Sequence, residues 1–170
     1  MRTKHRMLAG CMASLLSVIA AAFPYAHADA SLGIEAQRDK VVATALELQD
    51  KVKYVHWQDR QEMVAPYKTD CSGYTYLVYR LANVGVKLIN RDDDDQSHVG
   101  KLVTWGNFEK GDLLFFWNDP NNKGNVGHVG IYIGNGRMIH NADIGKDVVI
   151  SDVNSSFYRT RFIVGRRVIY

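Results

Sequence analysis

Apolar residues in the first half of the chain recur at helical intervals. Over residues 34–52 they stand three or four positions apart, with charged residues between them, at Val41, Ala45, Leu48 and Val52. This spacing places the apolar side chains on one stripe of a helix, where they can pack against a core. We therefore predict a helix over residues 34–52.

A second stretch with helical spacing, "CSGYTYLVYRLANVG", begins at Cys71, and Gly85 can end it. The apolar face of this helix would consist of Tyr74, Leu77, Val78 and Leu81. Residues 53–70, which separate the two helices, have no sustained periodicity and contain Pro66. We therefore predict that they form a loop.

The pattern changes after the acidic segment "RDDDDQSHVG". Short apolar runs then alternate with Gly, Asn and Asp, as in "DLLFFW", "HVGIYIG", "RMIHN", "DVVIS" and "RFIVGRRVIY". Runs of this length are typical of strands joined by hairpins. Helices first and strands later predict an α+β domain, in which helices pack on one side of an antiparallel β-sheet.

The first 28 residues have the order of a secretory signal peptide. A basic start is followed by an apolar run from Met7 to Phe23 and then by Ala-His-Ala, which predicts cleavage after Ala28. A membrane anchor is an alternative, although a run of seventeen residues is short for crossing about 30 Å of hydrocarbon. Lipidation of Cys11 in "LAGC" is another, although the apolar run lies after that cysteine. We expect residues 29–170 to form a single mature domain.

Cleavage would change both the charge and the cysteine content. The 21 basic residues would fall to 18 and equal the 18 acidic ones. A near-neutral mature chain gives no support for binding nucleic acid or anionic membranes through net charge. Loss of Cys11 would leave only Cys71, so no internal disulfide could form. Cys71 would then pair with another molecule or be a reactive thiol.

Cys71 stands where the second helix should begin, with Thr69 or Asp70 as the N-cap. The helix dipole at that end favours a thiolate by about 1 kcal/mol or less, which is under one pKa unit. A histidine base is therefore needed to activate the thiol. The mature chain offers four candidates: His56, His98, His128 and His140.

His128 and His140 lie on one expected hairpin, "GHVGIYIGNGRMIHN", and its turn decides whether they meet. A two-residue Asn-Gly loop pairs residue 131 with residue 140 and puts the two imidazoles on opposite faces. A three-residue loop, with Gly136 in the left-handed conformation, pairs residue 130 with residue 140. In that register the two histidines share a face, with backbones about 7–8 Å apart.

Other interpretations of these residues are open at this point. A buried cysteine is often an inert small hydrophobe, and a histidine on a strand is often a structural hydrogen-bonding residue. One cysteine and two histidines could also bind zinc, although the sequence has no close ligand pair such as CxxC or HExxH.

Three motifs resemble those of the NlpC (P-sixty) family of papain-like cell-wall cysteine peptidases. "TDCSGYTYLVYR" is similar to the family's Asp-Cys-Ser-Gly motif, "KGDLLFFW" to its Pro-Gly-Asp-Leu strand, and "GHVGIYIGNGRMIHN" to its His-Val-Gly-Ile strand with the histidine that follows. The resemblance covers residues 35–170 and implies a papain-like fold. It implies that Cys71 is the nucleophile, His128 the general base and His140 the group that orients His128.

The same resemblance implies supporting roles for three more residues. Tyr54, in "KYVHW", would help to bind the oxyanion, whereas Asp70 and Ser72 would hold the peptide stem. A plain N-cap role is an alternative for Asp70.

Two segments depart from the family pattern. Gln58 and Asp59 replace paired glycines in "YVHWQDRQ", and "LINRDDDDQS" replaces Leu-Pro-Arg-x-Ser/Thr. Both segments border the cleft in the family, so the bond that is cleaved stays open. We expect Asp92 to Asp95 to be a solvated loop, with calcium binding or repulsion of acidic wall polymers as alternatives.

The resemblance implies an exported peptidase that hydrolyses an amide bond in the peptide stems of peptidoglycan through a thioester, without a metal or organic cofactor. The expected bond joins D-glutamate to the diamino acid; cross-link cleavage and amidase activity are alternatives. A catalytically silent wall-binding module and a secreted toxin or acyltransferase are alternatives of other classes. The mature protein is expected to be a secreted or envelope monomer without a membrane span, with peptidoglycan stems as its partner and no nucleic acid.

Overall fold

The computed structural model describes residues 33–170, so the expected signal peptide and Cys11 lie outside the described residues. The main element is a six-stranded sheet in which every neighbouring pair is antiparallel. Its strands, in spatial order, are β3 (Lys101–Val103), β8 (Phe162–Arg167), β4 (Leu113–Phe116), β5 (His128–Gly134), β6 (Arg137–Asn141) and β7 (Val148–Asp152).

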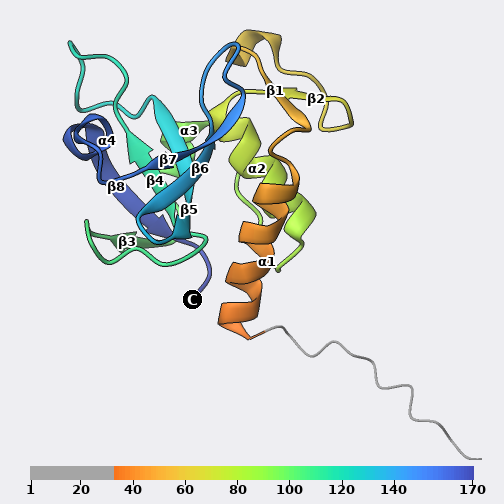
Figure 1. Cartoon of the computed structure of the whole chain (residues 1–170), viewed down its shortest axis with the longest axis horizontal. Coiled ribbons are helices and arrows are strands. Elements are labelled where there is room, and N and C mark those ends of the chain that lie inside the picture. Colours follow the sequence, from red (N-terminus) through yellow and green to blue (C-terminus); the bar gives the residue numbers. More distant parts are fainter. Residues whose placement is uncertain (1–32) are drawn as a thin grey trace, which may run out of the picture. The chain divides into compact units, whose positions relative to one another are not determined.

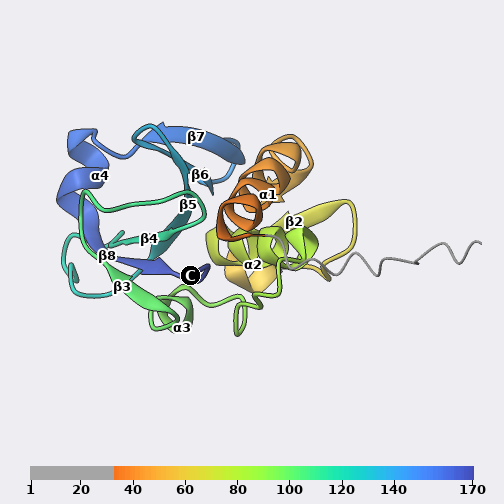
Figure 2. The same ribbon diagram turned by 90° about the horizontal axis from the view of Figure 1, so that it is seen from below.

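Two helices, α1 (Ile34–Glu47) and α2 (Cys71–Ala82), cover one face of this sheet (Figure 1, Figure 2). Their contact with β5 and β6 encloses the larger core, which includes Val41, Ala45, Tyr74, Leu77, Val78, Leu113, Phe115, Val129, Ile131 and Ile139. Each large apolar side chain buried in this way contributes about 1.5–3 kcal/mol. The predicted α+β class, with helices packed on an antiparallel sheet, is confirmed.

A smaller apolar cluster lies on the opposite face of the sheet. Leu114, Phe116 and Met138 point to this side, because they alternate along β4 and β6 with the residues of the larger core. The short helix α4 (Ser156–Arg161) covers the cluster through Tyr158. Both faces of the central strands are therefore buried.

Two predictions for the first half of the chain are wrong: the end of the first helix and the loop over residues 53–70. The helix that starts at Ile34 ends at Glu47, and Val52 belongs to strand β1 (Val52–Tyr54). Val52 is nevertheless buried, so a strand residue satisfies the apolar spacing that had indicated a longer helix. Residues 53–70 also contain η1 (Trp57–Asp59) and β2 (Tyr67–Thr69), which pairs in parallel with β1.

The second helix differs from its prediction at the C-terminal end. It ends at Ala82, because Asn83 adopts the left-handed conformation with φ 47° and caps the helix before Gly85 is reached. Leu81, predicted to lie on the apolar face, is 46% exposed. Leu77 and Val78 on the same helix are fully buried, as predicted.

The acidic run is a short helix and not a loop, although Asp92, Asp94 and Asp95 are exposed to solvent as expected. Asp92 caps α3 (Asp93–Gln96) by accepting a hydrogen bond from the backbone N–H of Asp95 at 3.1 Å. The buried Gln96 anchors it, since its side-chain amide donates to the carbonyl of Ser72 at 3.0 Å and accepts from Thr75 at 2.7 Å. The sequence did not predict α3, β3 or α4, which are all short.

The hairpin of β5 and β6 combines the two registers that the sequence left open. Its turn has two residues, Asn135 and Gly136, with φ of 53° and 71°, and Gly134 faces Arg137. Ile133 then has no partner, because Tyr132 faces Met138 and Ile131 faces Ile139. This β-bulge shifts the pairing by one residue. Between the bulge and the start of β5, the strands therefore keep the register that was expected for a three-residue loop. In that register His128 and His140 lie on the same face of the sheet.

Candidate active site

Cys71 is the first residue of α2, and Asp70 is the N-cap. The Asp70 carboxylate accepts a hydrogen bond from the backbone N–H of Gly73 at 3.0 Å, so the N-cap alternative for Asp70 is confirmed. Gly73 has to be a glycine, because a Cβ there would lie 1.7 Å from the Thr69 hydroxyl. The cap thus fixes the start of the helix and the place of the thiol.

The Cys71 side chain is buried against the start of β5. Burial raises the pKa of the thiol, and the negative charges of Asp70 and Asp93 raise it further. Backbone N–H groups of Val129 and Ser72 act in the opposite direction, because they hydrogen-bond to sulfur and favour the thiolate. The thiol is therefore neutral at rest, and the helix terminus does not by itself supply a thiolate.

His128 and His140 are in direct contact. Nε2 of His128 lies 2.8 Å from Nδ1 of His140, and the two rings stand edge to face with centroids 4.8 Å apart. His128 is the first residue of β5, one position before the Val129 backbone that contacts Cys71. The fold thus places the histidine pair at the end of the sheet where α2 begins.

Burial keeps both imidazoles neutral. It lowers the pKa of His128 to about 4, with a small opposing effect of the Asp143 carboxylate. Burial also lowers the pKa of His140 well below its ordinary value, and repulsion from Lys146, and from His128 whenever it is protonated, adds to this effect. At neutral pH, His128 is therefore able to accept a proton.

The outer nitrogen of His140 contacts two residues that the sequence did not single out. Nε2 lies 2.9 Å from the Ser151 hydroxyl on β7 and 3.2 Å from the Tyr158 hydroxyl on α4. Tyr158 also donates to Ser151 at 3.4 Å. No motif marks these positions, because their role arises from the packing of α4 against the sheet.

Tyr54, at the end of β1, lines the same cavity as the two histidines. Partial burial raises the pKa of the Tyr54 phenol to about 12, and repulsion from Cys71 in its thiolate form adds to this effect, so the hydroxyl keeps its proton. The backbone N–H of Tyr54 donates to the Asp147 carboxylate at 2.8 Å, which ties β1 to the turn before β7. The backbone of Tyr54 is thus held in place, and its protonated hydroxyl is able to donate a hydrogen bond.

Asp70 and Ser72 have partners within the protein. The Arg60 guanidinium forms an ion pair with Asp70 and donates to the Ser72 hydroxyl at 3.0 Å. Ser72 in turn donates to the carbonyl of Arg91 at 2.9 Å. Arg60, which sequence reasoning missed, stands in the segment that departs from the glycine-rich family pattern, and that departure was the one available signal.

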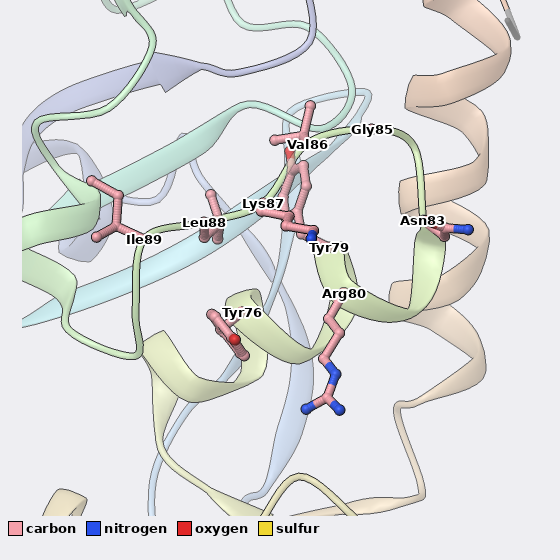
Figure 3. A pocket seen from close by; sticks show the side chains of 9 residues that line it. All are labelled: Tyr76, Tyr79, Arg80, Asn83, Gly85, Val86, Lys87, Leu88 and Ile89. Atoms are coloured by element: carbon pink, nitrogen blue, oxygen red, sulfur yellow. The ribbon is translucent and has the colours of Figure 1, made fainter.

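A cavity of about 280 Å³ opens beside the histidine pair, lined in part by Tyr54, His128 and His140. A larger cavity of about 450 Å³ lies elsewhere, between the second half of α2 and residues 83–89. Figure 3 shows its lining, which includes Tyr76 and Arg80 of α2. None of the predicted site residues lines this second cavity.

Two further findings concern residues 33–170 as a whole. Within that range, no three His, Cys, Asp or Glu side chains are grouped as they would be to hold a metal ion. None of the helices in the same range has the length and apolar character needed to cross a bilayer.

Comparison with known proteins gives a consistent family match. The model of the NlpC/P60 family matches residues 51–167. A γ-D-glutamyl-L-lysine dipeptidyl-peptidase from Bacillus cereus is 38% identical over 100 residues, which are 59% of this chain and 29% of the relative. The murein DD-endopeptidase MepS/murein LD-carboxypeptidase of Escherichia coli is 37% identical over 101 residues, which are 59% of this chain and 50% of the relative.

The crystal structure of an NlpC/P60 family protein from Bacillus cereus superposes with a TM-score of 0.65 and 32% identity. The superposition covers 78% of this chain and 40% of the other. The matched part of the chain spans half or less of the length of these curated relatives.

Proposed function

Because the chain belongs to the NlpC/P60 family, we propose that it is an exported cysteine peptidase that hydrolyses an amide bond in the peptide stems of peptidoglycan. One observation carries the proposal: the neutral His128–His140 pair, in contact at 2.8 Å, lies at the end of the sheet where Cys71 begins a helix. A buried cysteine that was only structural would not need such a pair beside it.

Cys71 is the nucleophile and His128 the general base in this mechanism. His128 accepts the thiol proton as sulfur attacks the carbonyl carbon, and the amide carbon becomes a thioester. Because burial disfavours a free thiolate, the proton moves to His128 together with the attack. His128 then gives the proton to the departing amine, and it later activates the water that hydrolyses the thioester.

His140 orients the base. A neutral imidazole has one donor and one acceptor nitrogen. The 2.8 Å contact uses Nε2 of His128, so Nδ1 of His128 is the nitrogen left to take the proton of Cys71. Nε2 of His128 then donates to Nδ1 of His140, and Nε2 of His140 donates to Ser151.

The oxyanion that forms on the attacked carbonyl needs donors. The backbone N–H of Cys71 supplies one, because it belongs to the first turn of α2, where N–H groups lack helical partners. The hydroxyl of Tyr54 supplies a second, since its raised pKa keeps it protonated. Asp70 and Ser72 contribute to the grip on the stem together with Arg60, which holds both.

The bond that we propose joins D-glutamate to the diamino acid. The Bacillus cereus relative is named a γ-D-glutamyl-L-lysine dipeptidyl-peptidase, which favours this bond. Cross-link cleavage is the second candidate, because the Escherichia coli relative is named a murein DD-endopeptidase. Amidase activity is a further alternative.

The site of action follows from the substrate. Intact peptidoglycan lies outside the cytoplasmic membrane, and residues 1–28 have the order of an export signal. We propose cleavage near Ala28 and a secreted or envelope location, with lipidation at Cys11 as the alternative.

Muropeptide digestion tests the proposal. Purified protein without residues 1–28 and its Cys71→Ala variant are incubated with defined muropeptides, and the products are identified by mass spectrometry. We expect new products with the wild-type protein and none with the variant. Unchanged muropeptides with wild type would refute hydrolysis, and binding without turnover would favour a silent wall-binding module. Equal activity in the variant would refute the mechanism.

A further inference from the structure

Asn141 is the residue of β6 that follows His140, and its side chain points to the opposite face of the sheet. It is fully buried and lies against the residues that precede Cys71. Nδ2 donates a hydrogen bond to the carbonyl of Thr69 at 2.8 Å and lies 3.5 Å from the carbonyl of Asp70. One buried amide therefore joins the strand of the histidine pair to the segment that leads into the proposed nucleophile.

Both of these carbonyls have a backbone partner without Asn141. The carbonyl of Thr69 accepts from the N–H of Val55 at 3.1 Å, and the carbonyl of Asp70 accepts from the N–H of Tyr74 at 3.0 Å. A buried carbonyl with one donor is not left as an unpaired polar group. The side-chain amide of Asn141 is therefore not needed to pair the backbone at this place.

The oxygen of the same amide disfavours folding. Oδ1 of Asn141 is buried and has no hydrogen-bond partner among residues 33–170. A buried acceptor destabilises the folded state when no protein donor replaces the water that it has lost. An apolar side chain of similar shape would avoid this cost, so stability alone does not explain an asparagine at this position.

The peptide unit between Asp70 and Cys71 gives the amide a different use. This unit contains the Asp70 carbonyl and the Cys71 N–H, which is the proposed oxyanion donor. The unit is trans and planar, so the direction of its carbonyl also fixes the direction of its N–H. Asn141 restrains it through the contact with Asp70 and through the shorter bond to Thr69, one unit earlier. The anchor itself is rigid, because β6 is paired with β5 and β7.

A second tie between Cys71 and the sheet involves the reacting atom. The backbone N–H of Val129 hydrogen-bonds to the sulfur of Cys71, and this sulfur becomes part of the thioester in the proposed mechanism. The bond from Asn141 includes no atom that changes its covalent partners. It can therefore hold the start of α2 against β6 through acylation and hydrolysis.

We propose that Asn141 is a positioning residue: its side-chain amide holds the peptide unit before Cys71, and with it the oxyanion donor, in place relative to His128 and His140. The inference rests on the proposed function, because it gives Asn141 a task in the reaction of Cys71. Loss of the amide should leave folding and substrate binding nearly unchanged but should slow the chemical step. Stability and turnover should therefore respond differently to the same substitution.

Asn141→Leu tests this separation, because leucine also branches at Cγ but has no polar side-chain atoms. Thermal denaturation measures stability, and steady-state kinetics on a muropeptide that wild type cleaves measure kcat and KM. We expect a melting temperature equal to or above that of wild type. We expect kcat to fall by about tenfold or more and KM to stay within about twofold, since small displacements at a reacting centre mainly slow the chemical step.

Asn107→Leu is the matched control. The Asn107 side chain is exposed and donates to the hydroxyl of Thr104 in the loop before β4, so its loss should change neither kcat nor KM. Asn141→Ala is the second variant. If leucine proves too large for the buried position, Asn141→Ala carries the kinetic test at temperatures below its own melting point.

Three outcomes would overturn the inference. A wild-type kcat in a folded Asn141→Leu or Asn141→Ala protein would show that the amide does not position the nucleophile. Failure of both variants to fold would show that the role of Asn141 is structural. Both of these outcomes leave the peptidase proposal standing. A wild-type protein that cleaves no muropeptide would refute the peptidase proposal, and the inference would fail with it.

Discussion

His140 stands in the middle of a chain of hydrogen-bonding groups. One nitrogen contacts His128 at 2.8 Å, and the other contacts the hydroxyls of Ser151 and Tyr158 at 2.9 Å and 3.2 Å. The proton positions along such a chain depend on one another, because each neutral imidazole must donate through one nitrogen and accept through the other. We therefore propose that Ser151 and Tyr158 position His128, the proposed base, although they do not touch it.

Removal of the Ser151 and Tyr158 hydroxyls should weaken the orientation of His128 but leave substrate binding intact. In a Ser151→Ala/Tyr158→Phe double variant, His140 loses the partners of its outer nitrogen and no longer fixes the proton on His128. We expect kcat to fall roughly tenfold, as for the loss of a hydrogen bond worth about 1.4 kcal/mol. KM should change little. Steady-state kinetics on a muropeptide over a range of pH measures both.

Two comparisons separate positioning from a merely structural effect. The single variant Ser151→Thr keeps a hydroxyl at this position. It should therefore retain most of the wild-type activity and the wild-type pH profile. Ser156→Ala removes an exposed hydroxyl from α4 and should have no effect. A double variant with the kcat and pH profile of wild type would contradict the positioning role.

At the scale of elements, the β5–β6 hairpin decides whether the histidines meet. The bulge at Ile133 gives a register in which Gly130 lies beside His140, and a Cβ at residue 130 would lie 3.2 Å from the His140 Cβ and 2.9 Å from the Met138 sulfur. Met138 is flexible, but His140 is held at both ring nitrogens. The glycine therefore makes room for the histidine pair.

Gly130→Ala should cost both stability and activity. Overpacking of this kind destabilises by about 1–3 kcal/mol, and the displaced His140 should lower kcat even in the fraction that is folded. Urea denaturation measures the first effect, and kinetics well below the melting temperature measure the second. Gly124→Ala is the control, because a Cβ at that loop position meets nothing within 4 Å. Unchanged stability and kcat in Gly130→Ala would show that the hairpin does not constrain His140.

At the scale of the whole molecule, the fold buries its proposed catalytic groups along with its core. Cys71, His128 and His140 are each less than 10% exposed, because α2, α4 and both sheet faces close around them. Burial of ionisable groups makes stability depend on pH wherever the folded and unfolded pKa values differ. The two histidines should therefore give the protein a characteristic sensitivity to acid.

Stability should fall between pH 6.5 and pH 4. The pKa of His128 is about 4 when folded, against 6.5 as its ordinary value, so the unfolded chain takes up a proton in this range before the folded one does. His128 alone should cost about 2 kcal/mol at pH 5 relative to pH 8. His140 shifts in the same direction. Urea denaturation of the Cys71→Ala variant at a series of pH values measures the loss without interference from the thiol.

The comparison is a His128→Gln change made in the Cys71→Ala variant, with stability measured over the same pH values. Glutamine does not titrate, so the part of the acid sensitivity that belongs to His128 should disappear. The acid limb of kcat/KM in wild type should also lie near pH 4 and not near pH 6.5, because His128 must be unprotonated to act as a base. A stability curve that is flat between pH 8 and pH 5 would contradict the burial argument.

Local patterns in the sequence were enough to determine the kind of fold and the main candidates for chemistry. Apolar spacing predicted α1, α2 and five of the strands, because periods of 3.6 and 2 are local properties of the backbone. The same spacing could not distinguish a helical Val52 from a buried strand residue. The motifs around Cys71, His128 and His140 suggested a nucleophile and its partners before any contact was known.

Only the tertiary structure decided how these residues meet. A single bulged residue, Ile133, resolves the register of the hairpin, and neither alternative derived from loop length alone included it. Ser151 and Tyr158 reach His140 from separate elements, so no local pattern marks them. Burial sets the charge states of Cys71 and His128, and the sequence pattern around each residue does not specify that burial. Register, solvent exposure and long-range contacts depend on how the elements pack, and a residue's neighbours along the chain do not specify that packing.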